Sequence, residues 1–324
     1  TDEWKRSGNY WFWLNSDGEM ATNELIEDDG DYYYVDSNGA MVTNRWIQLE
    51  NEDMDDENDS EYVWYYFQNN GKAYTASDGD SVSFKTINGK KYAFDEDGKM
   101  LFGWVDDDSA ERVDDSDGDG FKEGVYYFGG EDDGAMTVGW IQLDITYDEA
   151  TEDDYKYTAA AFNDDEDQSR WFYFKSNGKK VQSESADDTK EKTINGKKYA
   201  FDQYGAMVAE WSLDVEKAST NLGTSNTASV EKTGESAQYS KAWRYFNSVE
   251  DGSRVSKGWF KVVSAEYLNA DKYNDDEDSW YYADGSGNLY AGEFKTIKGK
   301  KYAFRDDGRM IDGLKFIYEE ERTG

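Results

Sequence analysis

The sequence predicts an all-β protein, a solenoid of about ten stacked β-hairpin repeats with long acidic loop insertions. A ten-residue phrase that begins at Thr86 returns 107 residues later at Thr193, and again 103 residues after that at Thr296. A shorter pattern recurs inside this large repeat: aromatic residues, a polar turn closed by Gly, and then Met. Because a single hairpin is marginal in water, such units fold by burying one another's aromatic faces.

The shorter unit is a hairpin signal. In Trp64-Tyr-Tyr-Phe67 a run of strand-forming residues leads into an Asn-rich turn that closes at Gly71. Lys91-Tyr-Ala-Phe94, with its own turn and Gly98-Lys-Met100, follows the same plan. Gly supplies the positive φ that a chain reversal needs. We therefore expect each aromatic strand to pair with the short strand after its turn, which often ends in Gly-Trp.

Side chains alternate between the two faces of a strand, so each unit has two distinct faces. Tyr65 and Phe67 share one face, and Trp64 and Tyr66 share the other. The phrase Lys-Lys-Tyr-Ala-Phe keeps the first pair and replaces the second by Lys and Ala. The retained face is thus predicted to be core, and the variable face is predicted to carry ligand sites. The Lys-Lys-Tyr-Ala-Phe units are interpreted as scaffold.

Composition excludes several classes of function. The net charge of −36 disfavours nucleic acid as a partner, because phosphates would be repelled. The chain has no Cys and no His, which excludes disulfides, a Ser-His-Asp triad and His-ligated metals. No apolar run is long enough to span a membrane. The remaining candidates are cationic ligands, metal ions, and neutral ligands such as sugars.

The chain is predicted to be a single array over residues 1–324, with super-repeats of approximately 62–170, 171–279 and 280–324. Long insertions, most of them acidic, separate its aromatic segments. They run approximately over residues 47–62, 105–123, 141–169, 212–241 and 261–279, and the fourth is rich in Ser and Thr. Three of them end in acidic runs just before a Trp, at residues 57–61, 163–167 and 274–278. These runs are predicted to keep an aromatic-rich surface soluble.

The pattern Trp-Tyr-Tyr-Phe, turn, Gly-x-Met, Gly-Trp resembles the cell-wall-binding repeat family, which includes choline-binding and glucan-binding repeats of Gram-positive surface proteins. The resemblance covers nearly the whole chain apart from the insertions. It implies ligand sites between consecutive hairpins, where the Gly-Trp tryptophan meets the first and third aromatics of the next hairpin. Four junctions here hold the full set: Trp46 with Trp64 and Tyr66, Trp140 with Trp171 and Tyr173, Trp211 with Trp243 and Tyr245, and Trp259 with Trp280 and Tyr282.

One departure from the family concerns spacing. The family joins these aromatics by a short connector, whereas Trp46 and Trp64 are 18 positions apart and Trp140 and Trp171 are 31 apart. The insertions either leave the aromatic cage intact, with a loop bulging outward, or pull it apart. A fifth junction is incomplete, because Trp104 faces Val125 in place of a first aromatic. The alternative at every junction is that the Trp residues only pack hairpins together.

A second candidate site is a calcium loop at Asp115, Asp117 and Asp119, since oxygen ligands at alternate positions followed by Gly120 suit a hard cation. The acidic residue expected at the twelfth position is replaced by Tyr126. The alternative is a solvated acidic loop. No other cofactor is indicated. Carboxylate pairs capable of glycoside hydrolysis abound, but no globular segment remains to house a catalytic cleft, so we expect no enzyme activity.

Two functional hypotheses follow. The first is a non-catalytic, secreted or cell-surface protein that binds choline-bearing cell-wall polymers or glycans through aromatic sites, several at a time. The second is a structural or adhesive spacer, or a host-interaction protein, whose aromatics are all packing and whose acidic loops bind calcium. The sequence does not fix the ligand or the oligomeric state.

Overall fold

The computed structural model describes residues 2–79, 81–146, 167–185, 188–214, 217–218, 237–265, 268 and 277–313. Its chain divides into two compact units. Unit 1 comprises Thr1–Gly139 with Phe174–Lys180, and unit 2 comprises Trp140–Tyr173 with Val181–Gly324. The predicted super-repeats, which divide the chain differently, stay a prediction. Within the described residues, no helix is long and apolar enough to cross a membrane.

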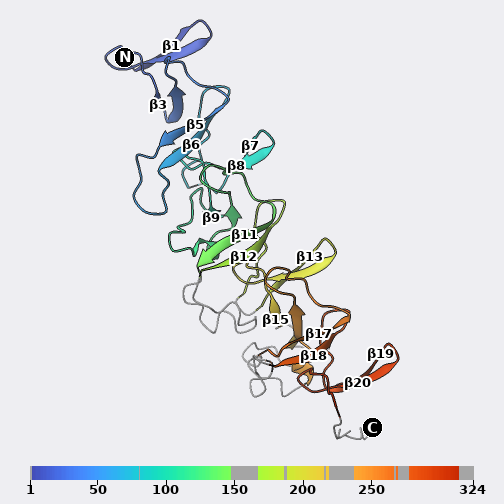
Figure 1. Cartoon of the computed structure of the whole chain (residues 1–324). Helices are drawn as coiled ribbons and strands as arrows, with labels where there is room; N and C mark the ends of the chain where they lie inside the picture. Colours follow the sequence, from blue (N-terminus) through green and yellow to red (C-terminus); the bar gives the residue numbers. More distant parts are fainter. Residues whose placement is uncertain are drawn as a thin grey trace. The chain divides into compact units, whose positions relative to one another are not determined.

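The all-β prediction is confirmed: the described strands form ten two-stranded sheets, several of them labelled in Figure 1. The sheets are β1 (Glu3–Ser7) with β2 (Tyr10–Leu14), β3 (Glu24–Asp28) with β4 (Asp31–Val35), β5 (Arg45–Glu50) with β6 (Tyr62–Phe67), β7 (Lys85–Ile87) with β8 (Lys90–Tyr92), β9 (Trp104–Val105) with β10 (Tyr126–Tyr127), β11 (Gly139–Thr146) with β12 (Asp167–Phe174), β13 (Lys190–Ile194) with β14 (Lys197–Phe201), β15 (Glu210–Leu213) with β16 (Trp243–Phe246), β17 (Gly258–Val263) with β18 (Asp278–Ala283), and β19 (Glu293–Ile297) with β20 (Lys300–Phe304). A 3-10 turn, η1 (Gly120–Lys122), and a short helix, α2 (Ala237–Ser240), complete the described elements.

The strand pairing differs from the prediction. Each aromatic strand pairs mainly with the strand before it, so that Trp46 of β5 lies opposite Tyr66 of β6. The segment after the glycine turn forms only an isolated bridge, such as Phe67 with Ala73. The acidic insertions therefore connect the two strands of one hairpin. In the Lys-Lys-Tyr-Ala-Phe hairpins a two-residue turn takes their place, as at Asn88-Gly89, where both residues have positive φ.

Consecutive hairpins are joined by a recurring backbone hydrogen bond. The residue at the Met position of Gly-x-Met donates its N–H to a carbonyl of the preceding hairpin. The acceptor is the first residue of that hairpin's four-residue segment of the Trp-Tyr-Tyr-Phe or Lys-Tyr-Ala-Phe type. Equivalent bonds in the two units join Met41 to Trp11, Ala73 to Tyr32, Met100 to Trp64, Met136 to Lys91, Lys180 to Val125, Met207 to Trp171, Arg254 to Lys198, and Met310 to Trp280. This register defines which positions in different repeats are equivalent.

The Gly-x-Met pattern also has a packing reason. The side chain of Met100 lies under the turn glycine of the next hairpin, Gly134, where an added Cβ would stand 2.7 Å from its sulfur. Met207 lies under Gly252 in the same way. Any other residue at these glycines would displace the methionine, because real Cβ atoms do not approach so closely. The Met of one repeat and the Gly of the next therefore hold successive turns in contact.

The predicted division of faces is confirmed in β6, where Tyr65 and Phe67 are buried while Trp64 and Tyr66 are half-buried. Tyr65 belongs to a core cluster with Val42, Val63 and Phe67.

In several repeats an Asx side chain closes the turn after the aromatic strand. Asp95 Oδ1 accepts the backbone N–H groups of Asp97 and Lys99, and Asn15 makes the same pair of bonds in the first repeat. Burial raises the pKa of Asp95 to about 6. Its carboxylate is thus less favourable in the folded chain than in the unfolded chain, and this cost grows as pH rises from 4 towards 7.

Replacing Asp95 by Asn is therefore expected to stabilise unit 1 at pH 7, by on the order of 1–3 kcal/mol. Asn keeps the oxygen acceptor, as Asn15 demonstrates in the same chain. The gain should vanish near pH 4, where the wild-type carboxyl is protonated. Urea unfolding at both pH values measures it. An equal gain at pH 4 and pH 7 would show that the ionised carboxyl is not the cause.

Candidate ligand-binding aromatic junctions

The first junction is centred on Trp46, whose ring has four aromatic neighbours. Trp64 and Tyr66 of the paired strand β6 lie with their ring centroids 6.4 Å and 5.1 Å away. Tyr92 and Phe94 of the next hairpin lie at 4.9 Å and 5.8 Å. The predicted trio is brought together, within one hairpin, and the next hairpin closes the other side. The 18-residue spacing leaves the cage intact because the insertion leaves from the hairpin tip.

The same geometry recurs at two further tryptophans. Trp140 contacts Trp171, Tyr173, Tyr199 and Phe201 at 6.2, 5.1, 4.9 and 5.7 Å. Trp259 contacts Trp280, Tyr282, Tyr302 and Phe304 at 6.2, 5.1, 4.8 and 5.8 Å. At all three junctions the tryptophans keep part of their surface exposed. We call these three the open junctions.

Sequence reasoning missed the contribution of the Lys-Lys-Tyr-Ala-Phe hairpins. Their tyrosines, Tyr92, Tyr199 and Tyr302, are the nearest ring neighbours of the three central tryptophans. Strand alternation had assigned these tyrosines to the core face. The phrase therefore does more than serve as scaffold, because each copy supplies one wall of an open junction. The signal was its spacing: a copy follows each open junction.

Two open junctions line cavities with acidic mouths. A cavity of about 220 Å³ at Trp46 and Trp64 is bounded by Asp132 and Asp133. A cavity of about 250 Å³ at Trp140 and Trp171 is bounded by Glu250 and Asp251. Tyr92 with Met100 and Tyr199 with Met207 complete the walls. Each acidic pair lies in the turn that packs on the cavity's methionine through Gly134 or Gly252.

The carboxylate of Asp132 is fixed beside the first cavity. Its Oδ1 accepts hydrogen bonds from the indole Nε1–H of Trp64, at 3.1 Å, and from Nε2 of Gln48, at 3.2 Å. An aromatic ring presents negative charge on its face, so both rings and carboxylates in this cavity favour a cation.

The incomplete fifth junction holds a cation of its own. Lys180 stands at the position that Met occupies in the open junctions, and its Nζ lies 5.4 Å from the ring centroid of Trp104. This ammonium donates a hydrogen bond to the carbonyl oxygen of Phe121, and the residue is only 4% exposed. Tyr127 and Phe174 also contact Trp104. An ammonium group is thus accommodated at an aromatic junction of this chain.

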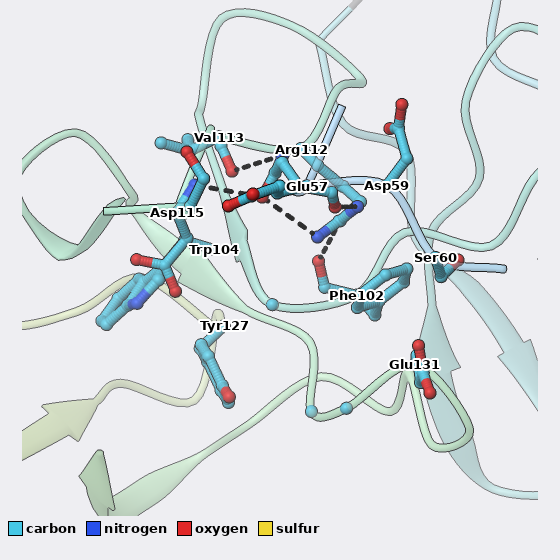
Figure 2. Close-up of a pocket in the computed structure, with 15 residues that line it drawn as sticks. Glu57, Asp59, Ser60, Phe102, Trp104, Arg112, Val113, Asp115, Tyr127 and Glu131 are labelled. Atoms are coloured by element: carbon cyan, nitrogen blue, oxygen red, sulfur yellow. Dashed lines mark hydrogen bonds between the residues drawn. The ribbon is translucent and has the colours of Figure 1, made fainter. Parts of the chain in front are cut away.

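The acidic loop proposed for calcium has a structural role in the described chain. Asp115 Oδ1 accepts the N–H of Gly120, and its own N–H donates to Asn58 of the first insertion. Arg112 donates hydrogen bonds to the backbone carbonyl of Asn58 and to that of Phe102, the latter drawn in Figure 2. Among the described residues, no group of three or more acidic side chains is arranged to hold a metal. The calcium prediction at Asp115, Asp117 and Asp119 gains no support from this geometry.

A cavity of about 360 Å³ lies beside this loop. Phe102, Trp104 and Tyr127 line it together with Arg112 and Glu131 (Figure 2). The guanidinium of Arg112 stacks on the ring of Phe102, 3.6 Å from its centroid.

Most of the acidic insertion around 141–169, including residues 163–166, and most of the run 274–278 lie outside the described residues.

The junction at Trp211 is closed. Its rings meet as elsewhere, with Trp243 at 6.4 Å and Tyr245 at 5.2 Å. However, Trp211 is 4% exposed and Trp243 is 1% exposed, because both belong to a core cluster that includes Tyr239 of α2. Burial also raises the pKa of Tyr245 to about 12. At this junction the tryptophans pack hairpins together and leave no open ligand site, which is the alternative to ligand binding given above.

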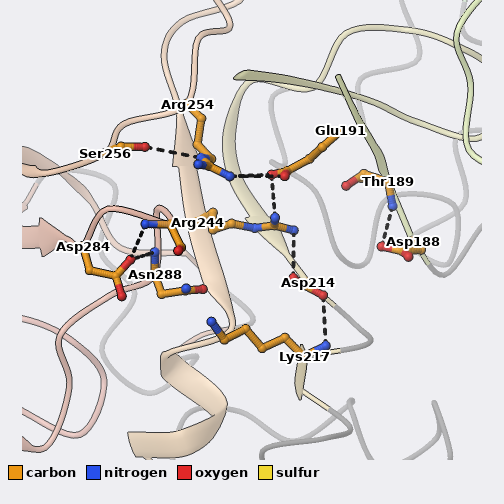
Figure 3. Close-up of polar contacts among 11 residues, drawn as sticks. Asp188, Thr189, Glu191, Asp214, Lys217, Arg244, Arg254, Ser256, Asp284 and Asn288 are labelled. Carbon is orange, nitrogen blue, oxygen red and sulfur yellow. Dashed lines mark hydrogen bonds and ion pairs between the residues drawn. The ribbon is translucent and has the colours of Figure 1, made fainter. Parts of the chain in front are cut away.

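A partly buried ion network, centred on the buried Arg244, supports the closed junction. Arg244, which occupies the position of Tyr65 in the equivalent strand, pairs with Glu191 of β13 at 2.5 Å and with Asp214 at 3.5 Å (Figure 3). Arg254 binds the same Glu191 at 3.2 Å. The face predicted to be apolar in every repeat is therefore charged here, and its charge is matched by the preceding hairpin.

Comparison with known families gives matches in several repeats. Residues 1–46 match the family model described as a choline-binding repeat. Residues 58–73, 82–100 and 166–180 match the model described as a putative cell wall binding repeat. These segments include β6, the first Lys-Lys-Tyr-Ala-Phe hairpin and the aromatic strand of the Trp140 junction.

Relatives resemble the chain over most of its length. Glucosyltransferase-S of Streptococcus mutans serotype c is 25% identical over 283 residues, covering 77% of this chain and 16% of that protein. Choline-binding protein F of Streptococcus pneumoniae, solved with a peptidoglycan analogue, is 19% identical with a TM-score of 0.49, covering 97% of this chain and 87% of that one. The autolysin LytC of the same organism, solved with a synthetic peptidoglycan ligand, is 20% identical with a TM-score of 0.45, covering 96% and 48%. The chain thus spans about a sixth of its curated relative.

Proposed function

Because the chain carries choline-binding and cell-wall-binding repeats, we propose that it is a non-catalytic module that binds ammonium-bearing cell-wall polymers at the bacterial surface or after secretion. Its ligand sites are the three open junctions at Trp46, Trp140 and Trp259. The observation that carries the proposal is the recurrence of one five-ring arrangement at these three places, with matching ring distances.

The chemistry of the junctions favours a cation. Two of the open junctions combine ring faces with carboxylates, and the fifth junction holds a lysine ammonium over its tryptophan. Each cation–ring contact contributes about 0.5–2 kcal/mol. Individual sites are therefore weak, and attachment to a polymer depends on several sites acting at once. The Trp211 junction and the Trp104 junction are not expected to take a ligand.

A second candidate ligand is a glucan. The match to Glucosyltransferase-S, whose name records glucose transfer, favours it. Flat aromatic rings stack on sugar rings as readily as they face cations. The purely structural spacer is the remaining alternative, and it predicts that no open junction responds to any ligand.

Titration with choline and with a soluble glucan, followed by tryptophan fluorescence, tests the proposal. Choline is expected to change the fluorescence of the wild-type chain. The Trp64→Ala, Trp171→Ala and Trp280→Ala variants should each fold and each lose one binding site from the stoichiometry. The control is Trp104→Phe, which should keep the full number of sites. A response to the glucan alone would support glycan binding in place of ammonium binding. No response to either ligand would support the structural spacer.

A further inference from the structure

We infer that the open junctions at Trp46 and Trp140 select an ammonium group that carries N–H donors, in preference to a quaternary one. This inference rests on the proposed function, because it specifies the ligand of the same sites. It concerns what the acidic pairs Asp132–Asp133 and Glu250–Asp251 add to the aromatic rings.

The acidic pairs recur at equivalent positions. Each belongs to the turn of the hairpin that is second after the junction's own hairpin, and each is followed at once by a glycine, Gly134 or Gly252. Each glycine lies on the methionine that forms the wall of the cavity. The carboxylates are thus held at the mouth by the repeat architecture itself. The two cavities, one in each unit, are thus lined by the same kinds of residue: two Trp, one Tyr, one Met and an acidic pair.

The rings and the carboxylates act on different features of a cation. Ring faces attract any positive charge, including a quaternary ammonium. A carboxylate adds a charge-assisted hydrogen bond only if the cation has an N–H to donate. Asp132 Oδ1 accepts from Trp64 and Gln48, which fixes the side chain, and no described hydrogen bond occupies its Oδ2. Since Asp132 lines the cavity, this oxygen is the acceptor that the inference assigns to a bound ammonium.

The fifth junction provides an independent observation of the same chemistry. There the cation is a primary ammonium, Lys180 Nζ, which combines a contact with the Trp104 ring and a hydrogen bond to an oxygen, the carbonyl of Phe121. It reaches the junction from the Met position of the repeat. The two acid-lined cavities offer the same combination, an aromatic ring and an oxygen acceptor, to an ammonium ligand from solution.

The test compares ethanolamine with its mono-, di- and trimethylated derivatives, the last of which is choline. This series keeps the hydroxyethyl group while the protonated nitrogen loses its N–H donors one by one. Calorimetric titrations use the full chain with Trp171→Ala and Trp280→Ala, so that the Trp46 junction is the open junction left. Asp132→Asn and Asp133→Asn are then added together. Asn retains the oxygen that accepts from Trp64.

Ethanolamine is expected to bind the Trp46 junction more tightly than choline does. The Asp132→Asn, Asp133→Asn pair should weaken ethanolamine by about tenfold and choline by about threefold or less. Asp28→Asn with Asp29→Asn, an acidic pair at the tip of the β3–β4 hairpin that lines neither cavity, is added to the same background as the matched control and should change neither ligand. Glucosamine is included as a second source of a primary ammonium, and tighter binding than ethanolamine would identify an amino sugar as the source.

The outcomes separate the two proposals. If the Asp substitutions weakened the binding of ethanolamine and of choline equally, the selectivity would be overturned. The carboxylates would then act only through their negative charge and not through hydrogen bonds to N–H donors. Tighter binding of choline than of ethanolamine, with no change on substitution, would also overturn it and leave the proposed function standing. Absence of binding by the whole series, in a chain that keeps its circular dichroism spectrum, would reject the proposed function itself.

Discussion

Removal of all three open junctions by Trp64→Ala, Trp171→Ala and Trp280→Ala is expected to lower the affinity for a polyvalent ammonium-bearing polymer by about 10²- to 10⁴-fold. Linked weak sites gain this factor from effective concentration, without any new contact. Loss of one junction should give an intermediate effect, and loss of two a larger one. Retention on a choline-substituted support, measured at high and low substitution density, records the series.

The three substitutions suit this purpose because the side chains are partly exposed, Trp280 by as much as 41%. Their removal should therefore leave the hairpins paired. At low substitution density, where only one site can engage at a time, the single variants should be almost indistinguishable from wild type. A triple variant that is retained as strongly as wild type would show that the open junctions do not hold the polymer.

Trp243→Ala is expected to destabilise unit 2 by about 3–5 kcal/mol, as is typical when a fully buried Trp is truncated. Trp243 occupies the same repeat position as Trp280 but is 1% exposed, and it packs within the cluster that contains Trp211, Tyr239 and Leu268. Trp280→Ala is the matched control, with an expected loss of about 1 kcal/mol or less.

Urea unfolding of the two variants measures this difference. The comparison isolates burial, since the residue type and its place in the repeat are the same. Equal losses for Trp243→Ala and Trp280→Ala would contradict the distinction between closed and open junctions. A Trp243→Ala variant that gained a ligand site would show instead that the closed junction only lacks space.

Much of the fold was predictable because its signals are local. The glycine turns identified the strands, and the alternation of Tyr65 and Phe67 with Trp64 and Tyr66 identified the two faces of β6 correctly. The pairing was not predictable in the same way. The visible turn at Gly71 suggested one partner, whereas the longer ladder joins β5 to β6 across an insertion that carries no turn signal.

The site was predictable in part. The residues that meet at Trp46, Trp140, Trp211 and Trp259 were identified through the resemblance to cell-wall-binding repeats, although they meet within one hairpin and not between two. Which junction is open was not, because closure at Trp211 depends on Tyr239 from an insertion that belongs to no repeat. The lysine at the Trp104 junction had a signal that was overlooked: Gly178-Lys-Lys180 has Lys where Gly-x-Met has Met.

The placement of the insertions has a consequence for how such chains diversify. The distance between paired tryptophans stays between 6.2 and 6.4 Å at four hairpins, although the connecting segments differ greatly in length. Closing a longer flexible loop costs only about 0.6 kcal/mol for each doubling of its length. Hairpin tips are thus positions at which foreign segments, such as epitopes or partner-binding peptides, can be grafted while the strand register and the neighbouring aromatic rings are retained.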